Sequence, residues 1–283
     1  IFRERAPLQI LDQIEVPTFL VVSWQDEQTG PRAARLSEFL PDDTPVQFAG
    51  TNGGHVAYFT PGISDELFRF YEYYLKEEVP DQDEGSYEEA LAAYEAEPIT
   101  MFWERTNAQS LLAQTPRFET THTEWPPENV ETWELYCQPD GSLDPSPPDG
   151  AGQETSSYEY TPITSEEQQI SRDEQGRLQW ERRPDDATVA FVSEELSTDR
   201  VCLGSGLVEL YLASTAEDTD VQVTLSEVRP DGEEMFVQMG VLRASHRAEN
   251  PDRTKPRRPW HTHRREDAQP LGDGPERMRV ELF

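Results

Sequence analysis

Two residues in the first part of the chain have the types and spacing that acid–base chemistry requires. Asp26 comes shortly after the apolar run I-E-V-P-T-F-L-V-V of residues 14–22, and His55 follows a second apolar run, residues 45–49, and a glycine loop. A carboxylate beside an imidazole holds the ring in one tautomer and stabilises its protonated form. The other ring nitrogen can then take a proton from a nucleophile, so the pair fits a general base and the group that orients it.

These residues can meet only if the elements before them bring them together. Residues 14–22 end in a continuous apolar run rich in β-branched residues, which is typical of a central parallel strand covered on both faces. In open sheets of alternating strands and helices, functional residues gather beyond the carboxyl ends of the strands. If the two strands are neighbours, we expect an Asp26 oxygen within about 3.2 Å of a ring nitrogen of His55. The alternative is structural, with Asp26 capping the helix that begins near Pro31 and His55 an incidental loop residue.

Three helices are predicted around these strands, over residues 32–40, 64–78 and 87–96. Ser64 is expected to cap the second, and Ser86 with Glu89 forms a capping-box pattern before the third. The first part of the chain, residues 1–115, is therefore predicted to be an α/β unit.

Beyond about residue 115 the pattern changes to short segments that alternate apolar and polar residues between turn signals. Residues 221–228 face residues 235–242 across the turn R-P-D-G, which predicts a hairpin. The acidic, proline-rich residues 144–169 are expected to form a long surface loop. Several short strands with such turns indicate a β-sandwich or jelly roll over residues 116–283.

Several motifs in this order resemble a known family. Trp24 precedes Asp26, Gly53-Gly54 precedes His55, and W-P-P follows at residues 125–127. Further along come E-D-T-D at residues 217–220, P-D-G at 230–232 and G-V-L-R-A-S-H-R at 240–247. Together they resemble the family of cocaine esterase, X-Pro dipeptidyl-peptidase and the α-amino acid ester hydrolases. The resemblance implies the C-terminal portion of an α/β-hydrolase domain followed by a truncated jelly roll.

The resemblance also implies an activity, a serine hydrolase acting on a small-molecule ester or peptide substrate without a metal or organic cofactor. Asp26 and His55 would be two members of its catalytic triad. The chain contains no G-x-S-x-G motif, and the nearest match, Gly62-Ile63-Ser64, lacks the second glycine and follows the histidine. We therefore expect the nucleophile to precede Ile1 and residues 1–283 to be inactive alone. The alternative is a non-enzymatic jelly roll that binds carbohydrate or a protein partner, with a vestigial α/β segment.

The remaining histidines and the two cysteines are given ordinary roles. His261 and His263 lie on a basic, proline-rich loop without neighbouring carboxylates in sequence, so a metal site is not favoured there. His122 and His246 are expected to be ordinary residues of the second part. Cys137 and Cys202 lack C-x-x-C spacing and are predicted to be buried thiols rather than metal ligands or a disulfide.

The charge of the chain excludes some partners. It has 283 residues, with 56 acidic against 24 basic residues and a formal net charge of -32. Such a chain repels nucleic acid, since binding there relies on neutralising phosphates with Lys and Arg. No run approaches the roughly 18 apolar residues of a membrane span. The first residues show no signal-peptide pattern, and we expect the N-terminus to be a cut through a longer protein. We favour a cytoplasmic location. Whether the protein forms a homo-oligomer stays open.

A dense carboxylate surface with only two lysines is typical of proteins that work in high salt. The melting temperature should rise between about 0.1 M and 1 M potassium chloride, because the Debye length shrinks to about 3 Å and screens the self-repulsion. Thermal unfolding followed by circular dichroism measures this. A melting temperature that stays constant or falls over that range would remove the inference of a halophilic source.

Overall fold

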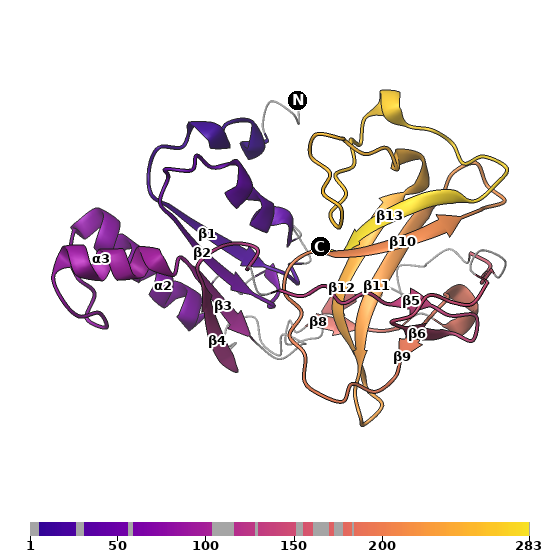
Figure 1. The fold of residues 1–283 in the computed structure, drawn as a ribbon, viewed down its shortest axis with the longest axis horizontal. Helices are drawn as coiled ribbons and strands as arrows, with labels where there is room; N and C mark the ends of the chain where they lie inside the picture. Colours follow the sequence, from indigo (N-terminus) through magenta and orange to yellow (C-terminus); the bar gives the residue numbers. More distant parts are fainter. Residues whose placement is uncertain are drawn as a thin grey trace.

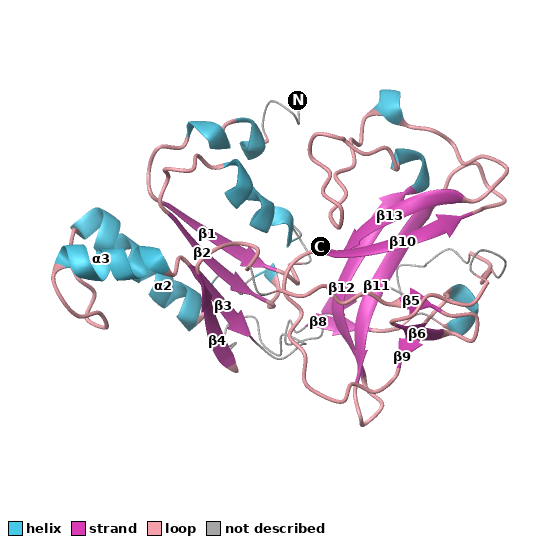
Figure 2. Cartoon of the chain, in the orientation of Figure 1, coloured by secondary structure: helices cyan, strands magenta, loops and turns pink. Residues whose placement is uncertain are grey.

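The computed structural model shows two groups of elements side by side (Figure 1). The structure describes residues 6–26, 31–55, 59–103, 116–127, 130–150, 155–160, 170–172, 178–182 and 184–282. The first group is a sheet with helices beside it, and the second consists mainly of long paired strands (Figure 2). The described part of the chain is thus mostly β-sheet with few helices.

The first sheet has four strands in the order β1 (Thr18–Ser23), β2 (Val46–Thr51), β3 (Ile99–Trp103) and β4 (Phe118–His122). β2 pairs in parallel with both β1 and β3, and β4 pairs with β3 in the antiparallel direction. The prediction that the strands before Asp26 and His55 are parallel neighbours is therefore confirmed. The predicted boundary at residue 115 falls in residues 104–115, outside the described part, and β4 beyond it completes the first sheet.

The helices differ from the prediction at two places. Residues 31–39 form a 3₁₀ helix, η3 (Pro31–Phe39), in place of the predicted α-helix. The next helix, α2 (Pro61–Tyr71), begins earlier than predicted, with Thr60 as N-cap and Pro61 in its first turn, so the expectation that Ser64 caps it was wrong. Proline fits a first turn because its fixed φ suits the helix and no N–H is needed there. Ser64 instead donates its backbone N–H to the Thr60 carbonyl at 2.9 Å.

The remaining helical segments follow the prediction more closely. α2 continues into a π-helical turn, η5 (Glu72–Lys76), and α3 spans Tyr87–Ala96. The capping box of Ser86 and Glu89 is present at the start of α3. Two short 3₁₀ turns, η1 (Pro7–Gln9) and η2 (Leu11–Gln13), precede β1.

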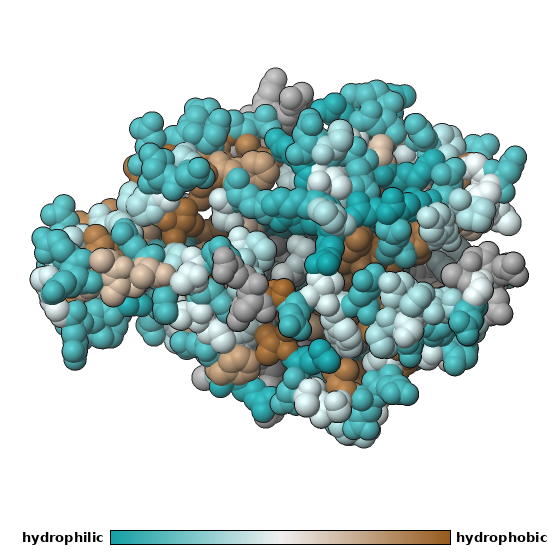
Figure 3. All heavy atoms as spheres, in the orientation of Figure 1, coloured by the Kyte–Doolittle hydropathy of each residue, from teal (hydrophilic) through white to brown (hydrophobic). Residues whose placement is uncertain are grey.

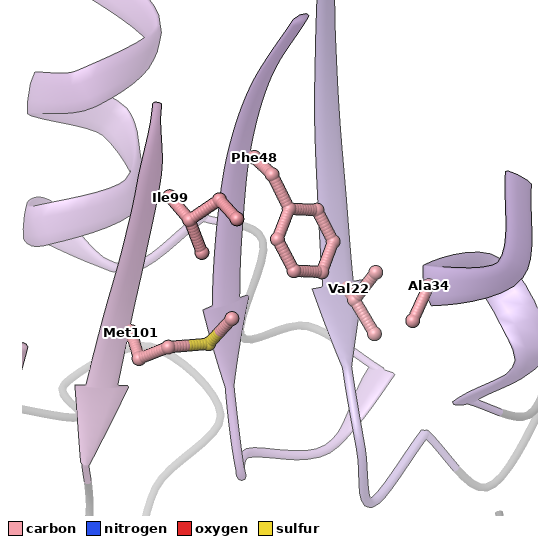
Figure 4. Packing of buried hydrophobic residues seen from close by; sticks show 5 residues of the cluster. All are labelled: Val22, Ala34, Phe48, Ile99 and Met101. Carbon is pink, nitrogen blue, oxygen red and sulfur yellow. The ribbon is translucent and has the colours of Figure 1, made fainter. Parts of the chain in front are cut away.

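One core of the first sheet lies between its strands and η3. Figure 4 shows Phe48 of β2 between Val22 of β1 and Ile99 of β3, with Ala34 of η3 facing Val22. All four side chains and Met101 are buried. This packing fixes the register of β1 and β2, because a shift of one residue would turn Val22 and Phe48 to the opposite face.

The second group contains two long antiparallel pairs. β11 (Asp220–Val228) pairs with β12 (Glu234–Arg243), which confirms the predicted hairpin, and β10 (Gly206–Leu212) pairs with β13 (Glu276–Leu282). Their shared core includes Leu242, Met278 and Val280, with Leu210 and Val223 packed against it. Residues from all four strands therefore bury one another, an arrangement compatible with the predicted β-sandwich.

Short elements complete this part of the chain. They are β5 (Tyr136–Cys137), β6 (Ser142–Asp144), β7 (Ile170–Arg172), β8 (Leu178–Trp180), β9 (Val192–Ser193), η6 (Asp185–Ala187), η7 (Ala244–His246) and η8 (Arg265–Asp267). The predicted surface loop of residues 144–169 lies partly outside the described residues. Cys137 and Cys202 are exposed, so the prediction of two buried thiols was wrong. The two-residue strand β5 is too short to bury Cys137 in a core.

Hydrophilic residues cover most of the face shown in Figure 3, with small hydrophobic patches between them. Among the described residues, no helix is both long enough and apolar enough to cross a membrane.

At Gly240 of β12 the two strand pairs approach each other closely. A Cβ atom at this position would overlap the main-chain carbonyl of Glu281 in β13. Gly240→Ala should therefore lower the free energy of unfolding by about 3 kcal/mol, since backbone must move to make room. Gly274→Ala is the matched control, because a Cβ there meets open space. Urea unfolding of the two variants compares them, and equal stabilities would contradict the packing of β12 against β13.

Candidate active site

The structure brings Asp26 and His55 into direct contact. The two carboxylate oxygens of Asp26 lie 3.0 Å and 3.1 Å from Nδ1 of His55. The contact that the sequence predicts between these side chains is therefore confirmed. The carboxylate is fully buried, whereas the imidazole is 30% exposed. One member of the pair is thus held inside the protein, and the other reaches the surface.

The position of the pair follows from the register of β1 and β2. Thr18 is opposite Val46 and Ser23 is opposite Thr51, so both strands end at the same level of the sheet. Asp26 lies three residues beyond Ser23, and His55 four residues beyond Thr51. Parallel strands that end together place the following residues at one edge, where the two side chains meet.

Hydrogen bonds join the two turns that carry the pair. The Ser23 hydroxyl lies 2.6 Å from the Gly53 carbonyl and 2.8 Å from the Gly54 carbonyl, and it is buried. The Gln25 backbone N–H donates to the Gly53 carbonyl at 3.0 Å, and that of Trp24 donates to the Thr51 carbonyl at 2.9 Å. Both carbonyls beside His55 are therefore tied to the end of β1.

Strand β12 holds the Asp26 turn from the other side. The Gln238 side-chain amide donates to the Trp24 carbonyl at 2.6 Å, and that of Gln25 donates to the Phe236 and Val237 carbonyls at 3.2 Å and 3.3 Å. Sequence reasoning missed these residues, because they are more than 200 positions apart and carry no local pattern. The nearest signal in the sequence is Gln25, a polar residue that stands between Trp24 and Asp26. Its side chain is buried in the structure.

The chemistry of the contact follows from its acceptors. An ionised carboxylate accepts hydrogen bonds and donates none, so Nδ1 of His55 carries the proton of this contact. Nε2 is then the ring nitrogen that can exchange a proton with a reacting group. The arrangement suits a general base whose orientation is set by a buried acid.

Comparison with known protein families matches residues 92–271 to the X-Pro dipeptidyl-peptidase C-terminal non-catalytic domain. The chain belongs to this family. The matched residues begin after both Asp26 and His55, so the words "non-catalytic" describe a stretch that contains neither. The family that the sequence resembles is thereby confirmed for the C-terminal portion. A search of curated proteins found no match.

Two solved structures share the fold of this chain over nearly the whole length of the chain. One is a CocE/NonD family hydrolase from Staphylococcus aureus, with a TM-score of 0.62 and 16% identity, over 96% of this chain and 44% of that chain. The other is an aminopeptidase from the marine sediment archaeon Thaumarchaeota archaeon, with a TM-score of 0.66 and 17% identity, over 99% of this chain and 47% of that chain. The family member thus spans less than half of either protein.

The other histidines of the family member lie away from the pair. His122 is bonded to Thr120 at 2.9 Å, and Nε2 of His261 lies 2.9 Å from the Arg279 carbonyl. The His263 ring lies near those of His246 and His261, with centroids 6.2 Å and 5.9 Å away. Within the described ranges, no three His, Cys, Asp or Glu side chains are placed to hold a metal ion.

Ser23 tests whether the two turns depend on each other. Ser23→Ala should lower the free energy of unfolding by about 1–3 kcal/mol, because the buried Gly54 carbonyl loses this donor and the Gly53 carbonyl keeps only the Gln25 N–H. Ser214→Ala is the control: its hydroxyl is exposed and accepts one bond from the Ala216 N–H, so the change should stay within about 0.5 kcal/mol. Thermal and urea unfolding measure both variants. Equal effects would show that the Ser23 bonds add nothing to the site.

Proposed function

We propose that this chain is the C-terminal portion of a serine hydrolase that cleaves acyl bonds, either esters or X-Pro-type peptide bonds. His55 is its general base and acid, and Asp26 orients the imidazole. The nucleophilic serine belongs to polypeptide that precedes residue 1. The observation that carries the proposal is the 3.0 Å contact between the buried Asp26 carboxylate and Nδ1 of His55.

The order of the residues and the sheet support the proposal. In α/β-hydrolases the acid precedes the histidine along the chain, and the serine precedes both. Here the acid follows β1 and the histidine follows β2, at the ends of adjacent parallel strands. We assign residues 1–115, together with strand β4 (Phe118–His122) that completes their sheet, to the C-terminal portion of such a domain, and the residues from there to 283 to a jelly roll. The lengths of the two similar structures leave room for a preceding half that carries the nucleophile.

The reaction uses the pair in two steps. Nε2 of His55 takes the proton of the serine hydroxyl as its oxygen attacks the acyl carbon, and the imidazolium then protonates the leaving alcohol or amine. In the second step Nε2 takes a proton from water, which attacks the acyl-enzyme, and the imidazolium then returns the proton to the serine oxygen as the acid is released. Asp26 keeps its charge throughout and stabilises the imidazolium. The buried position of the carboxylate strengthens this interaction, since water does not screen it.

A non-enzymatic role is the competing proposal, and the family description of residues 92–271 favours it for that part of the chain. It gives no reason for a buried carboxylate to face a partly exposed imidazole outside the matched residues. The two proposals differ in whether His55 is needed for turnover.

The serine hydrolase proposal predicts that a fluorophosphonate probe labels the longer protein at a serine before residue 1 and leaves residues 1–283 unlabelled. In the longer protein, His55→Ala should reduce turnover by several orders of magnitude, because the triad acts as a unit. Asp26→Asn should reduce it about 10⁴-fold, since the ring is left in the wrong tautomer. Ester and X-Pro amide substrates measured side by side give the rates.

His122→Ala is the matched control, because this histidine lies in β4 and bonds Thr120 rather than the pair. It should leave turnover unchanged. Normal turnover in the His55→Ala variant would refute the triad and favour the binding module. Labelling of a serine within residues 1–283 would place the nucleophile inside the chain and contradict the assignment.

A further inference from the structure

A small pocket of about 160 Å³ lies where the start of the chain meets the loop between β12 and β13. Its lining residues are Gln9, Asn250, Arg253, Trp260, Thr262 and Arg264. None of them touches the contact between Asp26 and His55 in the hydrogen bonds described above. The lining holds two arginines and no carboxylate, in a chain whose net charge is -32.

Three neighbouring cations are neutralised by carboxylates, in contrast to those of the pocket. Lys255 and Arg258 both contact Glu38, and Arg279 contacts Glu249 at 2.7 Å. Within the described residues, neither Arg253 nor Arg264 has a carboxylate within salt-bridge distance. These two guanidinium groups therefore keep their full positive charge available in a strongly acidic protein.

Aromatic rings hold one of the two arginines in place. The Arg253 guanidinium lies 5.1 Å from the centre of the Phe39 ring and 5.0 Å from that of Trp260. Cation–π contacts orient a guanidinium without occupying its N–H donors. Arg253 is therefore positioned before any ligand arrives, whereas Arg264 is exposed and can move toward one.

Two further polar side chains of the lining, those of Asn250 and Thr262, have donor groups available. The Asn250 side-chain oxygen accepts the Asp252 N–H at 2.9 Å, which leaves its NH₂ group as the part that can donate elsewhere. The Thr262 hydroxyl is buried and has no hydrogen-bond partner among the residues that the structure describes. Buried polar groups are nearly always bonded, so an orphan hydroxyl beside two unneutralised arginines indicates a missing acceptor.

We propose that this pocket binds a small oxyanion, a carboxylate or a phosphate-type group, held by Arg253, Arg264 and the Thr262 hydroxyl. Charge-assisted bonds from guanidinium groups are the strong way to hold such a group, and a planar fork matches two of its oxygens. The volume limits the ligand to a small anion or to the anionic end of a larger molecule. The proposal is independent of the serine hydrolase assignment, because it uses none of the same residues.

Isothermal titration with inorganic phosphate and, separately, with acetate tests the pocket at constant ionic strength set by potassium chloride. Constant ionic strength is needed because screening alone changes the behaviour of so acidic a protein. Saturable binding of at least one of the two anions is expected. Tighter binding of phosphate would identify the ligand as a tetrahedral, phosphate-type group, and tighter binding of acetate would identify it as a planar carboxylate. Absence of saturable binding of both anions up to tens of millimolar would overturn the proposal.

Two neighbouring arginines provide a matched pair of variants. Arg264→Gln should weaken binding at least tenfold, whereas Arg265→Gln removes the same charge from an exposed residue that does not line the pocket and should leave affinity unchanged. Equal weakening by both variants would show diffuse electrostatic attraction and contradict a site.

Thr262→Val tests the buried hydroxyl. Because the hydroxyl has no partner within the described part of the chain, its removal should leave the melting temperature of the ligand-free protein unchanged and weaken anion binding several-fold. A lower melting temperature with unchanged anion affinity would show that the hydroxyl serves the fold alone, against the proposal.

Discussion

The parallel pairing of β1 with β2 is the constraint on which the candidate site depends. Its register lets both strands end at the same level, so the turn that carries Asp26 and the loop that carries His55 leave the sheet together. A slip of one residue would turn the buried faces of both strands outward, and the core around Val22 and Phe48 prevents it. The Ser23 hydroxyl then joins the two turns beyond the strands. Packing of apolar side chains in the sheet thus fixes the distance between two polar groups outside it.

The second part of the chain also determines where the acid lies. Gln238 of β12 bonds the Trp24 carbonyl, while Glu281 of β13 is buried and contacts Arg32 and Arg35 of η3. Burial and, after it, the neighbouring Arg32 and Arg258 lower the pKa of Arg35 to about 10, so it stays charged at neutral pH. A buried carboxylate without such a partner would be strongly destabilising. A domain described as non-catalytic is therefore bonded directly to the turn that carries Asp26.

The sequence predicted the features that depend on local pattern. The apolar run before Asp26 and the R-P-D-G turn of the hairpin are visible within a few residues, and the capping box of α3 is a motif of Ser86 and Glu89. The start of α2 was misplaced because Ser64 suits an N-cap by residue type, whereas in the structure Thr60 takes that position and Pro61 lies in the first turn. The amide contacts of Gln25 and Gln238 could not be predicted, since they join residues that meet only after both parts of the chain have folded. The exposure of Cys137 depends on the length of β5, which pairing rather than composition determines.

Positive charge is scarce in this chain, and its distribution is informative for that reason. With 24 basic residues against 56 acidic ones, each cation has many carboxylates to pair with. Several of the arginines described here do so, including Arg243 with Asp220 and Arg277 with Glu209. An arginine that instead lies against two aromatic rings, as Arg253 does, keeps its charge while its surroundings repel anions in general. Such a group attracts an anion only at short range, where its field exceeds that of the acidic surface. The long-range repulsion and the local attraction together favour a small anion that fits the pocket over large polyanions such as nucleic acid.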